Sequence, residues 1–213
     1  MSLKEQMEHI YGTLSPEEIP WNLAGPPQTL MQLVESQWVL PCRAVDLGCG
    51  AGNSAVWLAT QGFDVTGIDV SPRALELGKQ LARSRGVSCR FVAADLLGDV
   101  SELGVDFDFA YDWEVLHHVF PEDRDRYVAN VQHMLRPGGK YLTVCFSEDD
   151  DPSFGGGGKY RETPLGTTLY FSSEEEIRTL LEPRFDIEEL CTVEVAGKYR
   201  PHKAVKALSR KRG

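Results

Sequence analysis

The stretch Ala44-Val45-Asp46-Leu47-Gly48-Cys49-Gly50-Ala51-Gly52-Asn53 decides how the rest of the chain is organised. An apolar, strand-like run breaks into alternating glycines, and a helical pattern begins at Asn53. Glycines at alternate positions let the backbone turn sharply and remove side chains, so that a ligand can lie against main-chain groups at the end of a strand. A loop of this kind is typical of a site for a nucleotide-like molecule.

Predicted strands and helices alternate on the carboxyl side of this stretch. Helices are expected over residues 53–60, from Ser71-Pro72 to Gly86, and from Pro121 onward. Strand-like apolar runs occupy residues 43–46, 64–68, 89–93, 107–111 and 140–146, and residues 185–195 with 204–208 indicate a terminal hairpin. The alternation predicts an α/β fold: a doubly wound, mostly parallel seven-stranded sheet with an antiparallel C-terminal hairpin.

The flanking segments carry weaker signals. Short helices are expected over residues 3–11, from the cap signature Ser15-Pro16-Glu17-Glu18, and over residues 30–38. Residues 147–170 contain an acidic run (148–151) and a glycine run (155–158), and together these favour a mobile connection. We interpret the acidic run as solvated.

Composition limits the class of protein. The 213 residues, 42% of them hydrophobic, are enough for one well-packed domain. The formal net charge of −10 disfavours nucleic acid and anionic lipid as partners, and no apolar run reaches the roughly 20 residues that span a bilayer.

The N-terminus has no signal-peptide core, so we expect a cytoplasmic protein without a membrane partner. The five cysteines show no paired spacing, which favours reduced, mostly buried thiols.

Carboxylates end four of the predicted strands, at Asp46, Asp69, Asp95 and Asp112. In a doubly wound sheet, ligands bind beyond the carboxyl ends of the strands. Asp69 is placed to accept hydrogen bonds from two ribose hydroxyls, and Asp95 from an exocyclic adenine amine. An acid at position 46 is unfavourable beside a phosphate and favourable beside a cation. The loop therefore indicates a positively charged nucleoside rather than NAD.

These motifs resemble those of class I S-adenosylmethionine-dependent methyltransferases. The resemblance covers residues 40–146 and rests on Val45-Asp46-Leu47-Gly48-Cys49-Gly50-Ala51-Gly52, Gly67-Ile68-Asp69-Val70-Ser71, Ala94-Asp95-Leu96, Phe107-Asp108-Phe109-Ala110-Tyr111-Asp112 and Leu135-Arg136-Pro137-Gly138-Gly139-Lys140. Trp21-Asn22, ahead of Pro26-Pro27, is similar to the N-terminal segment of small-molecule members of the thiopurine and halide type, in which a tryptophan closes over the cofactor.

The resemblance implies S-adenosylmethionine as the cofactor and S-adenosylhomocysteine as its product. Residues 46–52 would lie along the methionine part, Asp69 would hold the ribose, Val70 and Leu96 would enclose the adenine, and Asp95 would bond its amine. The cofactor-binding residues expected on this basis are Trp21, Asp46, Gly48, Cys49, Gly50, Asn53, Asp69, Val70, Ala94, Asp95, Leu96, Asp112 and Trp113.

His117 and His118 are the candidate catalytic residues. They follow the fourth predicted strand, on the side to which the transferred methyl should point. An imidazole titrates near neutrality and can take a proton from an attacking hydroxyl or amine. Packing or contact with the acceptor is the alternative role for both. No metal is expected, because these histidines and the acidic run lack ligand spacing.

The sequence thus predicts methyl transfer to a small-molecule acceptor, at O, N or S, by in-line displacement. The protein would be a monomer or homodimer, and a non-catalytic cofactor-binding protein or an NAD-dependent oxidoreductase on a similar fold stays open as an alternative. We expect a single domain over residues 1–213. It would comprise an N-terminal helical lid (1–40), a cofactor-binding core (41–146), a mobile substrate-binding or lid insertion (147–171), and a C-terminal helix and hairpin (172–213).

Overall fold

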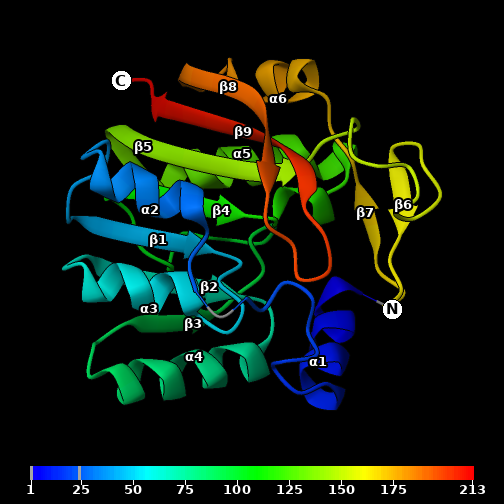
Figure 1. Cartoon of the computed structure of the whole chain (residues 1–213). Helices are drawn as coiled ribbons and strands as arrows, with labels where there is room; N and C mark the ends of the chain where they lie inside the picture. The colour runs from blue at the N-terminus through cyan, green and yellow to red at the C-terminus, as the bar shows by residue number, and fades with distance from the viewer. Residues whose placement is uncertain (1, 24) are drawn as a thin grey trace.

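The computed structural model describes residues 2–23 and 25–213 of the chain. At its centre is a seven-stranded sheet in the order β3-β2-β1-β4-β5-β9-β8 (Figure 1). Strands β1 to β5 run parallel, and β9 pairs antiparallel with both β5 and β8. The predicted parallel sheet with an antiparallel C-terminal hairpin is confirmed. The strands are β1 (Arg43–Leu47), β2 (Asp64–Asp69), β3 (Arg90–Ala93), β4 (Phe107–Trp113), β5 (Leu135–Phe146), β8 (Phe185–Val195) and β9 (His202–Lys211).

Helices cover both faces of this sheet. Ala44 of β1 packs into the cluster built with α2 (Gln28–Glu35) and α3 (Asn53–Thr60), whereas Val45 packs into the cluster built with α5 (Pro121–Met134) and α6 (Glu174–Leu181). Figure 1 accordingly shows α2 and α3 in front of the sheet and α5 behind it. Successive residues of one strand are thus buried on opposite faces, which explains its continuous apolar run.

The remaining helices extend the front layer toward the β3 edge. Helix α4 (Pro72–Arg85) packs beside α3 and against β2 and β3, and α1 (Leu3–Thr13) packs against α4 (Figure 1). Ser71 caps α4 by accepting a hydrogen bond from the Ala74 N–H, and Gly86 ends the helix with a φ of 67°. Glycine adopts this left-handed backbone without strain, so the predicted start and end of α4 are confirmed. Among the helices of the described residues, none is long and apolar enough to cross a membrane.

One predicted helix is absent and two predicted boundaries are wrong. The helix expected over residues 30–38 is α2, which begins at Gln28 and ends at Glu35. Residues 15–18 form a turn, in which the Ser15 N–H donates to the Glu18 carboxylate at 2.8 Å. Pro20 has no N–H for a helix and disfavours helical backbone at Ile19, so the cap signature is followed by no helix. Strand β5 begins at Leu135 rather than at residue 140, because residues 136–139 form an irregular extension of the strand where its register against β4 shifts.

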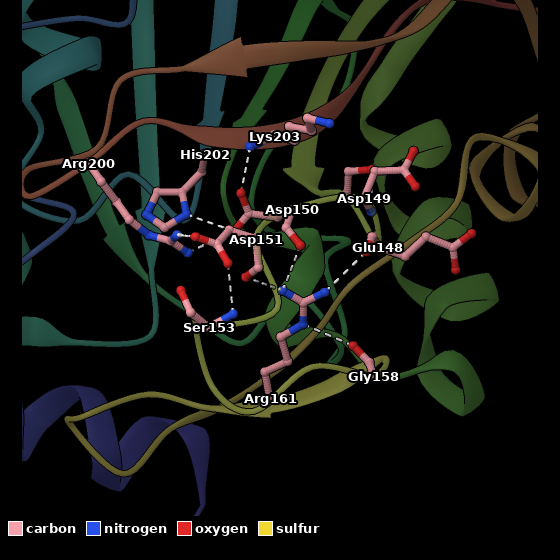
Figure 2. A network of polar contacts seen from close by, with 11 residues as sticks. Glu148, Asp149, Asp150, Asp151, Ser153, Gly158, Arg161, Arg200, His202 and Lys203 are labelled. Carbon is pink, nitrogen blue, oxygen red and sulfur yellow. Dashed lines mark hydrogen bonds and ion pairs between the residues drawn. The ribbon is translucent and has the colours of Figure 1, made fainter.

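The connection after β5 contains a small hairpin that the sequence did not predict, β6 (Tyr160–Glu162) paired with β7 (Thr168–Tyr170). Arg161 of β6 is 2% exposed, and its guanidinium donates to backbone carbonyls of the acidic run and of the glycine run (Figure 2). Buried guanidinium groups are stable only when their donors find acceptors, so Arg161 holds this connection together. The carbonyls belong to Glu148, Asp150, Asp151 and Gly158.

Two interpretations of polar and thiol residues need correction. The acidic run is not uniformly solvated, because Asp150 is 3% exposed and pairs with Arg200 and His202. Of the five free cysteines only Cys145 is buried, and the other four are partly exposed. Both errors arise because a residue's burial depends on contacts with segments far along the chain.

Candidate active site

A cavity of about 420 Å³ opens at the carboxyl ends of β1, β2, β3 and β4. Its volume is in the range of small-molecule sites, and this edge of a doubly wound sheet is where ligands bind. The N-terminal segment, the connection after β5 and the β8–β9 loop complete its walls. The lining includes both candidate histidines and every predicted cofactor-binding residue except Asp112.

The glycine loop forms one wall of the cavity. Gly48 and Gly50 have φ values of 67° and 52°, in the left-handed region that side chains rarely allow. A Cβ at Gly48 would collide with the Val115 side chain, and one at Gly50 would lie 2.7 Å from the Tyr11 hydroxyl. The Cys49 N–H between them donates to the Ile68 carbonyl at 2.9 Å. The loop therefore presents bare backbone to the cavity, as its sequence predicts.

Asp46 and Asp69 are buried carboxylates at the tips of β1 and β2. The two Asp69 oxygens accept hydrogen bonds from the Gly50 and Ser71 N–H groups, each at 2.8 Å, and burial raises the Asp69 pKa. Asp46 Oδ2 has no hydrogen-bond partner within residues 2–23 and 25–213. Burial, followed by the negative charge of Asp69, raises the pKa of Asp46 to about 8. A cation in the cavity would stabilise the charged form of this acid.

The ends of β2 and β3 form a second, more apolar wall. Val70, Ala94 and Leu96 line it, and the Ala94 N–H donates to the Asp69 carbonyl at 3.0 Å. Asp95 is exposed, and its Oδ1 accepts a hydrogen bond from the Leu97 N–H at 2.9 Å. A flat apolar slot with a carboxylate at its rim suits a purine base that carries an exocyclic amine.

The N-terminal segment closes the front of the cavity. Trp21 lines it, and the indole N–H donates to the Tyr11 hydroxyl at 2.9 Å, with the two rings packed edge to face. Asn53, at the start of α3, donates to the Asn22 side chain at 2.7 Å and to the Leu23 carbonyl at 2.9 Å. Asn53, the first residue of α3, therefore holds residues 22 and 23 of the N-terminal segment beside the glycine loop.

Asp112 lies outside the cavity lining, in the core between β4, β5 and α5. Its Oδ2 accepts hydrogen bonds from the hydroxyls of Tyr127, Tyr141 and Thr143, at 3.0, 2.8 and 3.0 Å. Burial raises its pKa to about 6, although these three hydrogen bonds oppose the rise. Side chains alternate between the faces of a strand, so Asp112 points into the core, whereas Trp113 beyond it lines the cavity.

His117 and His118 both line the cavity, and burial lowers the pKa of each. The pKa of His118 falls to about 4, and that of His117 falls well below its usual value because the charges of His118 and Arg124 add to burial. His117 stacks on Phe146 with ring centroids 4.4 Å apart, and its buried Nδ1 has no hydrogen-bond partner among the described residues. Both imidazoles are therefore neutral at neutral pH, and their low pKa values make them weak bases.

Sequence reasoning missed Glu114, which lines the cavity directly after β4. Its backbone has a φ of 63°, unusual for a residue with a side chain, and its N–H donates to the Val144 carbonyl at 2.7 Å. Burial raises the pKa of its carboxyl to about 7. Strain and a displaced pKa are common at functional sites, but no spacing in the sequence signals a left-handed glutamate.

The geometry fits S-adenosylmethionine better than a dinucleotide. Bare backbone, a buried acid without a partner and a carboxylate at the next strand tip match a nucleoside that carries a cation, whereas Asp46 would repel a phosphate. Within the part of the chain that the structure describes, no three His, Cys, Asp or Glu side chains are grouped to hold a metal ion.

Comparison with known proteins agrees with this geometry. Residues 44–139 match the family model described as a methyltransferase domain. The chain is 28% identical over 152 residues to the 2-heptyl-1-hydroxyquinolin-4(1H)-one methyltransferase of Mycobacteroides abscessus, a match that covers 69% of this chain and 66% of that relative. The curated relatives that it matches are covered over 32% to 66% of their length.

Two solved structures share the fold along nearly the whole chain. One, from work on the conversion of a disulfide bond into a thioacetal group during echinomycin biosynthesis, has a TM-score of 0.81 at 23% identity, over 99% of this chain and 93% of the other. The other is the 1,6-didemethyltoxoflavin-N1-methyltransferase of Burkholderia thailandensis, with a TM-score of 0.72 at 21% identity, over 99% and 88%. Residues 44–139 therefore resemble the methyltransferase domain that this family model describes, and the chain shares its fold with both solved structures.

Proposed function

We propose that the protein transfers a methyl group from S-adenosylmethionine to an O, N or S atom of a small-molecule acceptor by in-line displacement. The observation that carries the proposal is the continuity of the cavity. It joins the glycine loop and the buried acids at one end to an aromatic chamber, walled by Phe146 and Phe154, at the other. Donor and acceptor can therefore lie in contact and away from bulk water.

The residues at the donor end have separate tasks. Asp69 accepts hydrogen bonds from the ribose hydroxyls, since each of its oxygens has spare acceptor capacity beyond one backbone N–H. Asp46 faces the methionine part of the donor. The positive charge of that part provides the partner that Asp46 Oδ2 lacks in the free protein. The bound donor supplies a methyl group on a sulfonium, which is a good leaving group. The protein's contribution is thus largely positioning and exclusion of water.

A small acceptor is supported by what closes the cavity. The N-terminal segment and the β8–β9 loop meet over it, where Lys198 donates to the Ile19 carbonyl at 3.2 Å. A concave cavity of about 420 Å³ that these segments partly cover suits a metabolite-sized acceptor better than a polymer. The relative from Mycobacteroides abscessus acts on a hydroxyquinolinone, and the structural neighbour from Burkholderia thailandensis binds 1,6-didemethyltoxoflavin. Both acceptors are small molecules.

Three measurements test the proposal. Calorimetry should detect binding of S-adenosylhomocysteine, and a thermal-shift comparison should show stabilisation by this ligand but not by NAD. Incubation with S-adenosylmethionine and a panel of small acceptors should release S-adenosylhomocysteine. Stabilisation by NAD alone would favour an oxidoreductase, and binding without turnover of any acceptor would favour a non-catalytic cofactor-binding protein.

A further inference from the structure

A histidine that the sequence analysis did not single out lies at the acceptor end of the cavity. His202, the first residue of β9, lines the cavity, and its side chain is 13% exposed. Its Nδ1 lies 2.9 Å from Oδ2 of Asp150, whose side chain is 3% exposed (Figure 2). Asp150 belongs to the acidic run after β5. Two segments 52 positions apart therefore bring a buried carboxylate and an imidazole together beside the acceptor chamber.

The hydrogen bonds around Asp150 fix the tautomer of His202. Oδ1 accepts from the Lys203 N–H at 2.9 Å, and Oδ2 accepts from the Arg200 guanidinium at 3.3 Å. An ionised carboxylate can only accept, so Nδ1 of the neutral imidazole must carry the hydrogen. The lone pair then lies on Nε2, at the opposite edge of the ring. Figure 2 shows that this edge points away from Asp150.

Gly197 lies against the Nε2 edge of the His202 ring. A Cβ at this position would lie 3.2 Å from Nε2 and 2.8 Å from Cδ2 of His202, and Gly197 itself lines the cavity. A larger residue would cover the edge that carries the lone pair. Gly197 and His202 both line the cavity, so the absence of a side chain at position 197 leaves the Nε2 edge uncovered by that residue.

The surroundings of His202 are aromatic. Its ring lies 4.9 Å from Phe146 at an angle of 34° and 5.1 Å from Phe154 at 63°, measured between ring centroids. Phe146 also stacks on His117. The Arg200 guanidinium binds the Asp150 carboxylate and the Arg161 guanidinium binds the Asp150 carbonyl, so the side chains packed on the His202 ring are the aromatic Phe146 and Phe154. Such a chamber suits a planar aromatic acceptor.

We propose that His202 is the general base that takes the proton from the heteroatom of an aromatic acceptor, and that Asp150 positions it. The proposal rests on methyl transfer as the function. It selects His202 over His117 and His118, which have no carboxylate partner and whose pKa values lie far below neutrality. His202 would be a catalytic residue and Asp150 a positioning residue.

The proposed step conserves atoms and charge. A lone pair of the acceptor oxygen, nitrogen or sulfur forms a bond to the methyl carbon, and the carbon–sulfur bond breaks with its electron pair remaining on sulfur. The acceptor proton moves to Nε2, so the positive charge of the sulfonium ends on the imidazolium. Asp150 stabilises that imidazolium through Nδ1–H, as a carboxylate does for a catalytic histidine in other enzymes.

The first experiment measures methyl transfer to hydroxy-, mercapto- and amino-naphthalenes and quinolines. His202→Asn should lower kcat at least about 100-fold with a hydroxyarene, the usual scale for loss of a general base, and leave KM and S-adenosylhomocysteine affinity nearly unchanged. A nitro-substituted hydroxyarene is already ionised and needs no base, so its kcat should fall much less. The matched control is His133→Asn, on the exposed face of α5.

Each outcome of this experiment decides between the proposals. Failure of the wild-type protein to bind S-adenosylhomocysteine contradicts the proposed function. Binding without methylation of any arene contradicts an aromatic acceptor. Methylation that His202→Asn leaves intact, or reduces equally for both hydroxyarenes, contradicts a base at position 202.

The second experiment determines the tautomer of His202 without an acceptor and adds a rescue assay with the hydroxyarene. Nitrogen-15 spectra of histidine-labelled protein should show His202 as the Nδ1–H tautomer, and Asp150→Asn should convert it to the Nε2–H tautomer, because an amide N–H then faces Nδ1. S-adenosylhomocysteine binding reports whether this variant is folded. In addition, kcat of His202→Ala should recover at least about tenfold with added imidazole. An Nε2–H tautomer in the wild-type protein, or no rescue of a folded His202→Ala variant, overturns the assignment.

Discussion

The carboxylates along one edge of the sheet fall into two groups. On the β1–β2 side, Asp46 and Asp69 face the cavity, and Asp46 Oδ2 has no hydrogen-bond partner among the described residues. On the β4–β5 side, Asp112 binds three hydroxyls, and Asp150 binds Arg200, His202 and the Lys203 N–H. Asp112 Oδ1 also has no hydrogen-bond partner among the described residues, but Asp112 and Asp150 lie outside the cavity lining, so only the β1–β2 acids are open to a ligand in the cavity.

This difference separates acids that a ligand in the cavity can reach from acids that it cannot reach. A buried carboxylate oxygen without a partner destabilises the free protein, and at Asp46 a cationic ligand in the cavity can supply the missing partner. Asp112 and Asp150 lie outside the cavity lining, and donors of the protein itself hold them. Removal of a β1–β2 acid should therefore change donor binding, whereas changes around Asp112 should alter stability alone.

The largest effect is expected for Asp69→Ala. Loss of two hydrogen bonds between the carboxylate and the ribose, at about 1.5 kcal/mol each, would weaken S-adenosylhomocysteine binding about 100-fold. Isothermal titration calorimetry measures this change. Asp64→Ala, which removes an exposed acid at the opposite end of the same strand, is the matched control and should bind normally. Unchanged affinity in Asp69→Ala would remove Asp69 from the ligand-binding group.

A comparable loss of stability, without loss of binding, is expected for Tyr141→Phe. The hydroxyl donates to Asp112 at 2.8 Å, and a buried hydrogen bond to a charged group contributes about 1.5–3 kcal/mol. Urea denaturation should show a fall of that size in the free energy of unfolding, while donor affinity stays at the wild-type value. Tyr160→Phe, on an exposed side chain, should change neither. A large loss of donor affinity would return Asp112 to the cofactor site.

The contrast between Asp69 and Asp112 also shows how far the sequence alone can predict the site. The Asp46 and Asp69 positions follow from local pattern, because a strand, a glycine loop and a strand-end acid are close in sequence. Asp112 ends a strand in the same way, but its environment depends on Tyr127 and Tyr141, which come from other elements. The alternation of strands and helices likewise predicted the parallel sheet, because the residues of each βαβ unit are consecutive in the sequence.

The acceptor end was not predictable for the same reason. Asp150 belongs to a run that composition identifies as solvated, and His202 follows a loop without a distinctive motif. Their contact depends on β9 pairing antiparallel with β5, which places Ala204 opposite Phe146 and His202 just beyond it. The positive φ of Glu114 is another feature set by tertiary packing. The contacts around His202 are therefore set by long-range pairing, whereas the glycine loop and the acids beside it follow from local sequence.

A smaller effect, of about tenfold, is expected when pH changes the charge of Asp46. Its pKa of about 8 means that it is mostly neutral at about pH 6.5, so S-adenosylhomocysteine affinity should rise about tenfold toward about pH 8.5. Asp46→Asn should remove this rise. 5′-Methylthioadenosine, which lacks the cationic amino-acid part, should bind equally at both pH values. Identical pH profiles for the two ligands would show that Asp46 does not face a cation.

The same variant tests the stability cost of an acid without a partner. Because the folded-state pKa of Asp46 lies above its ordinary value of 3.8, its contribution to stability is full below about pH 4 and is lost as pH rises toward about 8. Asp46→Asn should therefore raise the Tm of the free protein at about pH 8 and change it little at about pH 4. Bound S-adenosylhomocysteine should remove this difference in Tm between Asp46→Asn and the wild-type protein at about pH 8.

The smallest effect is expected for Trp21→Phe, which tests whether the N-terminal segment belongs to the ligand-binding side. The change removes the indole N–H that donates to the Tyr11 hydroxyl, and a neutral hydrogen bond contributes about 0.5–1.5 kcal/mol. Donor affinity should fall about two- to tenfold by calorimetry. Trp38→Phe removes a similar indole bond, to Glu188 outside the cavity lining, and should leave affinity unchanged. Equal losses in both variants would mean that the segment stabilises the fold without contacting the ligand.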